Sequence, residues 1–404
     1  MLKHLRMMSL ASSTGLAALA GFGFATAAHA EATIHAFAGG TDGLEPGAGL
    51  TPDGAGNLYG TTAGGGGTGC QGSGWGTVFE VAPDGTETVL YSFTGGSDGY
   101  DPEGQLIFDS AGNLYGATAA GGSADAGTVF KLAPDGTETV LYAFQNGTDG
   151  AVPQGNLAID SGNNLYGTTD YGGNTPGCGG RGCGTVFKVT PGGQENVLYT
   201  FQGLSDGEIP TGGVIADNNG NLYGTALGGG NACDCGVVFK IAAGGTESVL
   251  YTFRGGRDGM LPVGPLVANN AGDLYGVTEY GGGSGDGNGT VFRIAPNGTE
   301  KVLYAFRSGD DGAVPYAGLV MDAKGNLYGT TYFGGGTRCG KTGHIGCGTV
   351  FKVKPDGAET VLFSFYQRRG IYPGAPLTLQ GNRLYGTAEE GGQWNDGVVF
   401  SVKK

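Results

Sequence analysis

The sequence predicts an all-β protein, a β-propeller of seven blades with four antiparallel strands in each blade. Three observations predict this fold: a unit of roughly 53 residues that recurs seven times, four strand-like runs in each unit, and one unit that is divided between the two ends of the chain. Repeats of about 40–50 residues are typical of propellers and arrays, and sheet-forming repeats of this size usually form propeller blades.

Each unit contains two phrases in a fixed order, separated by a glycine-rich gap. The first phrase is Asn-Leu-Tyr-Gly or a close variant, and it begins at Asn57, Asn113, Asn164, Asn221, Asp273, Asn326 and Arg383. The second is Gly-Thr-Val-Phe or Gly-Val-Val-Phe, and it ends at Phe79, Phe130, Phe187, Phe239, Phe292, Phe351 and Phe400.

A third phrase, Val-Leu-Tyr-x-Phe or, once, Val-Leu-Phe-Ser-Phe, occurs six times after the second phrase, and its seventh copy is Thr33–Phe37 at the start of the chain. An open array needs polar capping repeats at its ends, and neither end of this chain has one. A closed ring needs no caps. We therefore predict that Thr33–Phe37 pairs beside Val398–Val402 and completes the last blade.

Within one unit, the four strand-like runs alternate or carry β-branched and aromatic residues. In the second unit they are Leu106–Phe108, Leu114–Thr118, Thr128–Leu132 and Thr139–Phe144. Tight turns rich in Gly, Pro and Asp join the first run to the second and the third to the fourth. The other two connections are longer and vary between copies. Because strand direction alternates, both long connections lie on one face, where we expect function.

The first 30 residues have the features of a signal peptide. Lys3 and Arg6 form a basic start, the run 16–28 is apolar, and Ala28-His29-Ala30 fits a small-x-small cleavage site. A transmembrane anchor is the alternative, but it needs about 20 strongly apolar residues, and this run is poor in Leu, Ile and Val. We expect cleavage near Glu31, no membrane span afterwards, and a single propeller domain of residues 31–404 in a secreted or periplasmic bacterial protein.

Composition is compatible with a packed core, although 89 of the 404 residues are Gly. No three-residue period is present and aromatic residues make up 10% of the chain, so the glycines are expected in turns. Without Lys3 and Arg6, the remaining 19 Lys and Arg face 36 Asp and Glu, a net charge of −17. This charge disfavours nucleic acid and anionic membranes as partners. We expect a monomer without a cofactor, although the charge is compatible with a divalent cation such as calcium.

Six of the seven cysteines lie in pairs within long connections. In an exported chain, the pairs Cys178/Cys183 and Cys339/Cys347 are expected to form local disulfides. A zinc site is the alternative, but the spacings are poor for zinc. The third pair, Cys233 and Cys235, encloses so small a ring that its bonding stays open. We expect Cys70 to be unpaired.

An Asp precedes Gly in six copies of the long connection from outer to inner strand: Asp42, Asp98, Asp149, Asp206, Asp258 and Asp311. A ring of cation ligands is one interpretation. A residue present in nearly every blade is better explained by what every blade needs, and Asp side chains commonly accept hydrogen bonds from nearby backbone N–H groups in loops.

Candidate ligand-binding residues are those at which the copies differ. Directly after the second strand, the first two copies carry Ala63 and Ala119, whereas later copies carry large or acidic residues. These are Asp170, Tyr171, Glu279, Tyr280, Tyr332, Glu389 and Glu390, and nearby loops add Tyr316, His344, Tyr372 and Trp394. Aromatic faces beside carboxylates suit a sugar ring. The alternative is that these residues fill the centre of the ring or pack between blades.

The three phrases together resemble the GloVer tandem repeat, found in exported bacterial proteins, and the resemblance covers essentially the whole chain after residue 30. It implies an extracytoplasmic repeat protein, often with a C-terminal surface-sorting signal, and it implies no particular activity. This chain ends at Lys404 without such a signal, so we expect release or periplasmic residence rather than surface anchoring.

Two functions follow from these features. The favoured one is a non-catalytic propeller that binds an extracellular glycan or protein on the face of the long connections. The alternative is a polysaccharide-active lyase or glycoside hydrolase. After residue 30 the chain has only His35 and His344, so catalysis would depend on carboxylates or Tyr, and no catalytic residue is assigned.

Overall fold

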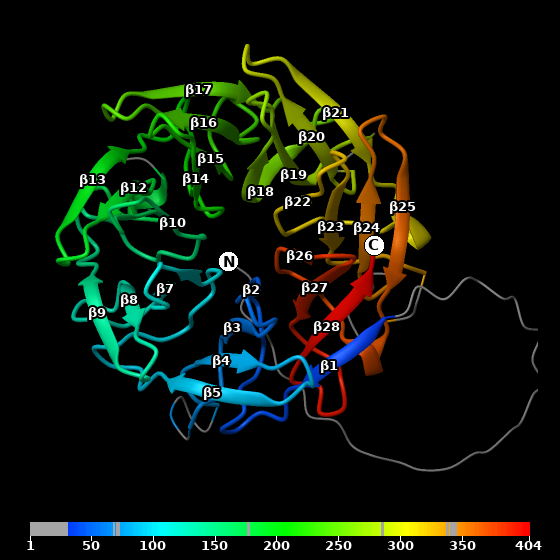
Figure 1. The fold of residues 1–404 in the computed structure, drawn as a ribbon. Helices are drawn as coiled ribbons and strands as arrows, with labels where there is room; N and C mark the ends of the chain where they lie inside the picture. Colours follow the sequence, from blue (N-terminus) through cyan, green and yellow to red (C-terminus); the bar gives the residue numbers. More distant parts are fainter. Residues whose placement is uncertain are drawn as a thin grey trace, which may run out of the picture.

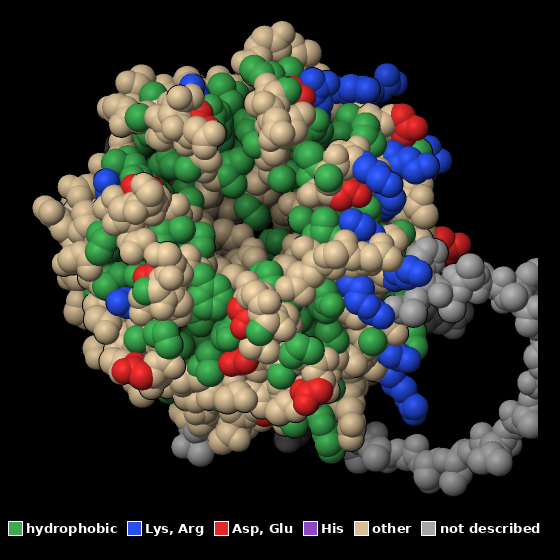
Figure 2. Space-filling model, in the orientation of Figure 1, with side chains coloured by type: hydrophobic (Ala, Val, Ile, Leu, Met, Phe, Trp, Pro, Cys, Tyr) green, Lys and Arg blue, Asp and Glu red, His purple; other side chains and the backbone are tan. Residues whose placement is uncertain are grey.

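Seven blades surround a central axis in the computed structural model (Figure 1). The structure describes residues 31–67, 69, 73–175, 178–283, 287–336, 339 and 346–404. In these ranges 28 strands form seven four-stranded antiparallel sheets, which confirms the predicted seven-bladed propeller. Figure 2 shows that the ring is hollowed at its centre, and that Lys and Arg gather over β21, β24, β25 and β28 on the face drawn. No helix in the described ranges is both long and apolar enough to cross a membrane.

Each blade runs outward from a short inner strand. Blades one to three are β2 (Thr51–Pro52), β3 (Leu58–Thr62), β4 (Thr77–Val81), β5 (Glu87–Ser92); β6 (Ile107–Phe108), β7 (Leu114–Thr118), β8 (Thr128–Leu132), β9 (Glu138–Ala143); and β10 (Ala158–Ile159), β11 (Leu165–Thr169), β12 (Thr185–Val189), β13 (Glu195–Thr200). Blades four and five are β14 (Val214–Ala216), β15 (Leu222–Ala226), β16 (Val237–Ile241), β17 (Glu247–Thr252); and β18 (Met260–Ala268), β19 (Leu274–Tyr280), β20 (Thr290–Ile294), β21 (Glu300–Ala305). Blades six and seven are β22 (Val320–Met321), β23 (Leu327–Thr331), β24 (Thr349–Val353), β25 (Glu359–Ser364); and β26 (Thr378–Gln380), β27 (Arg383–Ala388), β28 (Val398–Lys403), β1 (Ala32–Ala36). Three 3₁₀ turns complete the elements: η1 (Cys178–Gly180), η2 (Gly309–Asp311) and η3 (Gln367–Arg369).

The ring is closed by its two ends. Strand β1 pairs antiparallel with β28, with Ala32 opposite Ser401 and Ala36 opposite Val398 (Figure 1). The seventh blade therefore takes its outer strand from the start of the chain, as the divided repeat predicts.

The core lies between the blades and depends on one Gly–Phe pair in each. In blade one, Gly60 is opposite Phe79 across the β3–β4 ladder, and a Cβ at Gly60 would lie 2.6 Å from Cζ of Phe79. The fully buried Phe79 ring then meets Phe37 of the preceding blade edge to face, with ring centroids 5.1 Å apart. The glycine therefore makes room for the aromatic residue that joins neighbouring blades.

The Asn-Leu-Tyr phrase owes its recurrence to the tight turn before it. In blade two, Asp109 accepts hydrogen bonds from the backbone N–H of Asn113 (2.9 Å), from its side-chain amide (2.7 Å) and from the Tyr115 hydroxyl (3.0 Å). Blade five exchanges the acid and the amide, so that Asp273 instead pairs with Arg293 at 2.7 Å. These bonds lower the pKa of Asp109 and its counterparts, although burial opposes the effect.

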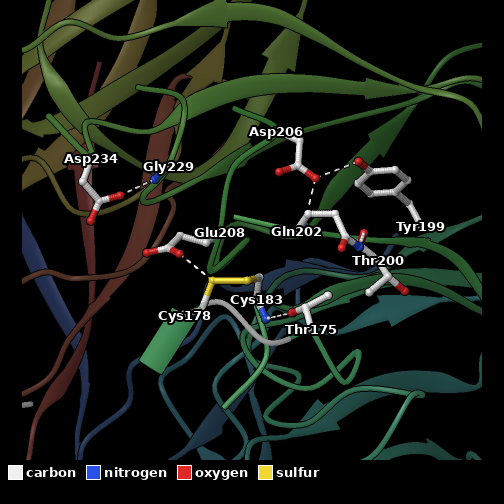
Figure 3. Close-up of a disulfide and its surroundings, with 10 residues drawn as sticks. All are labelled: Thr175, Cys178, Cys183, Tyr199, Thr200, Gln202, Asp206, Glu208, Gly229 and Asp234. Atoms are coloured by element: carbon white, nitrogen blue, oxygen red, sulfur yellow. Dashed lines mark hydrogen bonds between the residues drawn. A yellow bond between two sulfur atoms is a disulfide. The ribbon is translucent and has the colours of Figure 1, made fainter. Parts of the chain in front are cut away.

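The six Asp residues of the long connections support their loops, as predicted. Each accepts a hydrogen bond from the backbone N–H four residues earlier, for example Asp206 from Gln202 at 2.9 Å (Figure 3). In five of the six, the hydroxyl of the outer-strand Tyr also donates to the Asp, as Tyr199 does to Asp206 at 2.7 Å. The remaining members of the set follow the same N–H pattern.

The two expected disulfides, Cys178–Cys183 and Cys339–Cys347, are present. Cys233 and Cys235, whose bonding the sequence left open, also form a disulfide. In the first loop, the N–H of Cys183 donates to Thr175 Oγ1 at 3.0 Å, and the Glu208 carboxylate lies against the sulfur of Cys178 (Figure 3). Cys70 lies outside the described residues.

Candidate functional site: the central cavity

A cavity of about 650 Å³ occupies the centre of the ring on the side of the long connections. Its wall is formed by two sets of residues that recur once per blade. Ligand sites of proteins commonly have this size and a mixture of apolar and polar walls. The cavity is therefore the candidate functional site.

The first set follows a proline in each loop that leads to an inner strand. Its members all line the cavity: Gly47, Glu103, Gln154, Thr211, Val263, Tyr316 and Gly374. Their chemistry differs from blade to blade, although the backbone frame is the same.

The residue before that proline has a left-handed backbone in all seven blades. These residues are Glu45, Asp101, Val152, Ile209, Leu261, Val314 and Tyr372, with φ between 56° and 61°. Such a backbone costs roughly 1–2 kcal/mol for a residue other than glycine. Hydrogen bonds to the backbone offset this cost. In blade two, the N–H of Asp101 donates to the Trp75 carbonyl at 3.1 Å, and the Asp101 carbonyl accepts from Ala119 at 2.9 Å.

Three of these bonds tie the cavity to the disulfide loops. The N–H groups of Ile209, Leu261 and Tyr372 donate to the carbonyls of Cys183, Cys235 and Cys347, respectively. Each disulfide loop therefore holds the cavity-forming loop of the next blade.

The second set lies directly after the second strand of each blade. It comprises Ala63, Ala119, Asp170, Leu227, Glu279, Tyr332 and Glu389. Five of the seven line the cavity: Ala63, Leu227, Glu279, Tyr332 and Glu389. The side chains are small in blade one and large or acidic in blades five to seven.

Aromatic rings form much of the wall contributed by blade six. Tyr332 stacks on Tyr372 with centroids 4.9 Å apart and planes at 10°, and Tyr316 lies tilted beside it at 6.0 Å. The Tyr332 hydroxyl donates to Glu389 Oε2 at 2.8 Å. Burial and the neighbouring Glu389 charge raise the pKa of Tyr332, so its hydroxyl stays a hydrogen-bond donor.

Carboxylates dominate the charge of the cavity. The acidic lining residues are Glu45, Asp101, Glu103, Glu279, Glu389 and Glu390, and the lining residues that the structure describes include no Lys, Arg or His. Burial raises the pKa of Glu279 to about 7, and it raises that of Glu389 to about 7 against the opposing hydrogen bond from Tyr332. Burial and the charge of Glu45 raise the pKa of Asp101 to about 6. The site therefore favours neutral or cationic groups.

Asp170 is the residue of the second set in blade three, and it is more buried than the acidic residues that line the cavity, with 5% of its surface exposed. Its Oδ1 atom is buried without a hydrogen-bond partner in the described part of the chain. Burial raises the pKa of Asp170 to about 7. Its charge also contributes to raising the pKa of Glu103, after the larger effects of burial and of the Asp101 charge.

A family model for the Gloeobacter/Verrucomicrobia repeat matches residues 10–180 and 175–400. The chain belongs to this repeat family. No curated protein matches the chain.

Solved structures with a similar fold share little sequence with this family member. Virginiamycin B lyase from Staphylococcus aureus has 14% identity and a TM-score of 0.60, over 93% of this chain and 99% of its own. A puromycin hydrolase mutant has 13% identity and a TM-score of 0.54, over 86% of this chain and 50% of its own. PorZ, a surface component of the type-IX secretion system of Porphyromonas gingivalis, has 14% identity and a TM-score of 0.51, over 88% of this chain and 46% of its own. Identities this low show the propeller fold alone.

Six of the residues selected from the sequence of this repeat protein line the cavity: Glu279, Tyr280, Tyr316, Tyr332, Glu389 and Glu390. Tyr372 lies behind Tyr332, and Asp170 holds the matching position in blade three. Two of the other three lie elsewhere. Tyr171 faces Arg181, whose guanidinium carbon is 5.5 Å from the ring centroid. Trp394 is 56% exposed and is not part of the cavity wall, and His344 lies outside the described residues.

Sequence reasoning missed the cavity residues that come from blades one to four. Glu45, Asp101, Glu103, Gln154 and Thr211 all line the cavity. A signal for them was present, because every copy has an x-Pro-x triplet after its Asp-Gly or Arg-Gly step, and the residue on each side of that proline varies.

Proposed function

We propose that this protein binds a glycan, or a segment of a protein, in the central cavity, outside the cytoplasm and as a monomer. The proposal rests on one observation: the side chains that line the cavity differ from blade to blade, although the backbone that carries them is repeated in every blade. The position that is Ala63 in blade one is Glu279, Tyr332 and Glu389 in blades five to seven, and the position that is Gly47 in blade one is Tyr316 in blade six, although the repeated backbone requires none of these residues. The three disulfides support a location in an oxidising compartment.

The cavity chemistry narrows the ligand class. Tyr332, supported from behind by the stacked Tyr372, and the tilted Tyr316 offer apolar surface to the C–H side of a sugar ring. The carboxylates accept hydrogen bonds from hydroxyl or amino groups. Among the described lining residues, no basic side chain is present to neutralise the charge of an acidic ligand. Neutral or amino-substituted sugars, or a Lys-bearing protein segment, therefore fit better than uronic acids or sulfated glycans.

The test is a glycan-array screen followed by calorimetry with the best ligand. Tyr316→Ala should weaken binding by about 10-fold, because an aromatic contact contributes about 0.5–1.5 kcal/mol beyond its buried area. Trp394→Ala is the matched control, since Trp394 is an exposed aromatic residue outside the cavity, and it should bind as the wild type does. If Trp394→Ala lost binding and Tyr316→Ala kept it, the ligand site would lie on the outer loops.

A second candidate function is cleavage of an extracellular polysaccharide, by lyase or glycoside hydrolase chemistry. Glu279 and Glu389 favour it, because carboxyl groups with a pKa of about 7 serve as general acids or bases near neutral pH. The Tyr332 hydroxyl beside Glu389 supplies a proton donor at 2.8 Å.

Removing the charge of Glu389 distinguishes ligand binding from polysaccharide cleavage. Glu389→Gln keeps the shape of the cavity and removes one titrating group. Loss of sugar-chain cleavage with retained binding would identify an enzyme. Unchanged binding together with no release of reducing ends or unsaturated products, in either the wild type or the variant, identifies a binding protein.

A further inference from the structure

The outer edge of the ring has a repeated polar cluster between neighbouring blades. We call the contact between two neighbouring blades a seam. In five of the seven seams, a Tyr of the outer strand of one blade donates a hydrogen bond to the Asp of the long connection that follows it. The Glu that begins the outer strand of the next blade lies beside that Asp. Between blades two and three, Tyr142 donates to Asp149 Oδ2 at 2.9 Å, and the Asp149 charge raises the pKa of Glu195, after the larger effect of burial. The tyrosines of these seams are Tyr91, Tyr142, Tyr199, Tyr251 and Tyr304.

The seam at which the ring closes has a histidine in place of this tyrosine. His35 of β1 packs edge to face on Phe37 at 4.8 Å, as Tyr91 packs on Phe93 at 5.1 Å. It shares the seam with Asp42 of the following loop and with Glu87, the first residue of β5 in blade one. One nitrogen of His35 and one carboxylate oxygen from each acid lie within 4.8 Å of one another.

Two atoms of this cluster are buried without a hydrogen-bond partner in the described part of the chain: Glu87 Oε1, as in the corresponding Glu of the five seams with a Tyr, and His35 Nε2, which is particular to this seam. His35 Nε2 is 3.3 Å from Asp42 Oδ1, but the two atoms form no hydrogen bond. The other Asp42 oxygen accepts from the N–H of Ala38 at 2.6 Å and so holds the carboxylate in place.

Apart from His35, no basic side chain of the described residues forms an ion pair with the carboxylates of this seam. The two other ion pairs among the described residues lie elsewhere, at Arg293–Asp273 and Arg369–Glu31. Asp396 adds a third carboxyl group, and the charge of Asp42 contributes to raising its pKa. A bound cation would both neutralise this cluster and provide a partner for the two orphaned atoms.

We propose that His35, Asp42 and Glu87 form a divalent metal site, best suited to zinc, at the closure of the ring. One imidazole and two carboxylates are a ligand set that zinc accepts, with water in the fourth position. Two ligand atoms about 2.1 Å from one zinc ion at the tetrahedral angle lie about 3.4 Å apart. The observed separation of 3.3 Å between His35 Nε2 and Asp42 Oδ1 matches this value.

The site would link the two sides of the closing seam. His35 and Asp42 belong to β1 and the loop after it, whereas Glu87 begins the outer strand of blade one. Because the metal binds the closed ring and not the unfolded chain, it should raise the thermal stability of the whole protein.

The test is a titration of chelator-treated, untagged protein with Zn²⁺, followed by calorimetry and by thermal unfolding. The wild type should bind one zinc per chain at this seam, and its Tm should rise by about 2–5 °C at a 100-fold excess over Kd. His35→Tyr is the matched variant, because Tyr is the residue in five other seams. It should keep the metal-free Tm and lose zinc affinity by at least about 100-fold, more than the loss of an outer-shell partner causes.

Two further variants make the proposal falsifiable at independent positions. Glu87→Gln removes a ligand from the neighbouring blade and should give the same loss of zinc affinity. Tyr142→His recreates the triad with Asp149 and Glu195 and should add a second zinc per chain. Equal zinc binding by the wild type and His35→Tyr, no zinc binding by the wild type, or a Tyr142→His variant that stays at one zinc would each overturn the proposal. The first outcome would place the metal elsewhere, and the second would leave only a proton shared between Asp42 and Glu87.

Discussion

At the scale of single residues, the Gly–Phe pair is the most demanding contact in each blade. Gly167 in blade three lies opposite Phe187, and an added Cβ would lie 2.6 Å from Cζ of Phe187 and 2.8 Å from Cδ2 of Leu157. Both neighbours are buried and belong to the contact surface with the preceding blade. Neither can move without disturbing that surface, so the glycine is required for its lack of a side chain.

We predict that Gly167→Ala destabilises the protein by about 1–3 kcal/mol, the usual cost of overpacking a core. The measurement is denaturant unfolding at equilibrium. Gly192→Ala is the control, because Gly192 lies in an exposed turn where the nearest atom to a new Cβ is 3.9 Å away, and it should leave stability nearly unchanged. Equal effects of the two substitutions would contradict the role assigned to the pair.

At the scale of elements, β1 does more than add one strand. It supplies Phe37 to the core beside Phe79 and Val399, and Glu31 next to it forms an ion pair with Arg369 at 3.2 Å. In the seam between blades six and seven, this pair replaces the Tyr–Asp–Glu cluster of other blades. The seventh copy has Arg368 and Arg369 where the other copies have the Asp-Gly pattern. The positive charge of Arg369 is therefore matched by the negative charge of Glu31 at the start of the described chain.

We predict that deletion of Glu31–Ala38 leaves blade seven with three strands and lowers Tm markedly, because the deletion exposes the β28 edge and removes Phe37 from the core. Thermal unfolding with light scattering measures both the loss of stability and the aggregation expected from an open edge. A truncated protein that melted at the temperature of the intact chain would show that ring closure contributes nothing.

At the scale of the whole molecule, the seams make stability depend on pH. Burial, with added repulsion from an Asp of the preceding blade, raises the pKa from 4.5 to about 7 in six Glu residues: Glu87, Glu138, Glu195, Glu247, Glu300 and Glu359. The folded state therefore binds more protons than the unfolded state between these two values. Stability from these groups is fully present below pH 4.5 and is lost as the pH rises through about 7.

We predict a higher Tm at pH 5 than at pH 8, measured by calorimetry. Asp322, whose pKa is lowered to about 2, acts in the opposite direction: its contribution to stability is lost as the pH falls from 3.8 toward 2. Stability should therefore be greatest at about pH 4–5. Substituting Glu138, Glu195 and Glu247 together by Gln should reduce the difference between pH 5 and pH 8, because an amide does not titrate. Glu80→Gln on β4, which is not a member of these six Glu residues, should leave this difference unchanged. A Tm that rose from pH 5 to pH 8 would contradict the assignment.

The frame was predictable from the sequence because identical physical requirements recur in every copy. A repeated turn needs Asp109 and Asn113, a repeated interface needs Phe187, and the divided repeat implies closure by β1. The cavity was predictable only in part. Glu279, Tyr332 and Glu389 follow strands whose ends are visible in the sequence, whereas Glu103 and Gln154 reach the centre only because a left-handed residue and a proline turn the loop inward.

The pairing of β1 with β28 also sets the order of events when the protein is made. Ala32 and Ser401 are partners in this ladder, so almost the entire chain must emerge from the ribosome before the first strand can take its place. Until then, the early blades lack their closing neighbour. Contacts so distant in sequence slow folding, because a long loop must be closed before they form. A chain whose final folding step waits for its last strand stays open during synthesis, which is the state that an export pathway for unfolded chains requires.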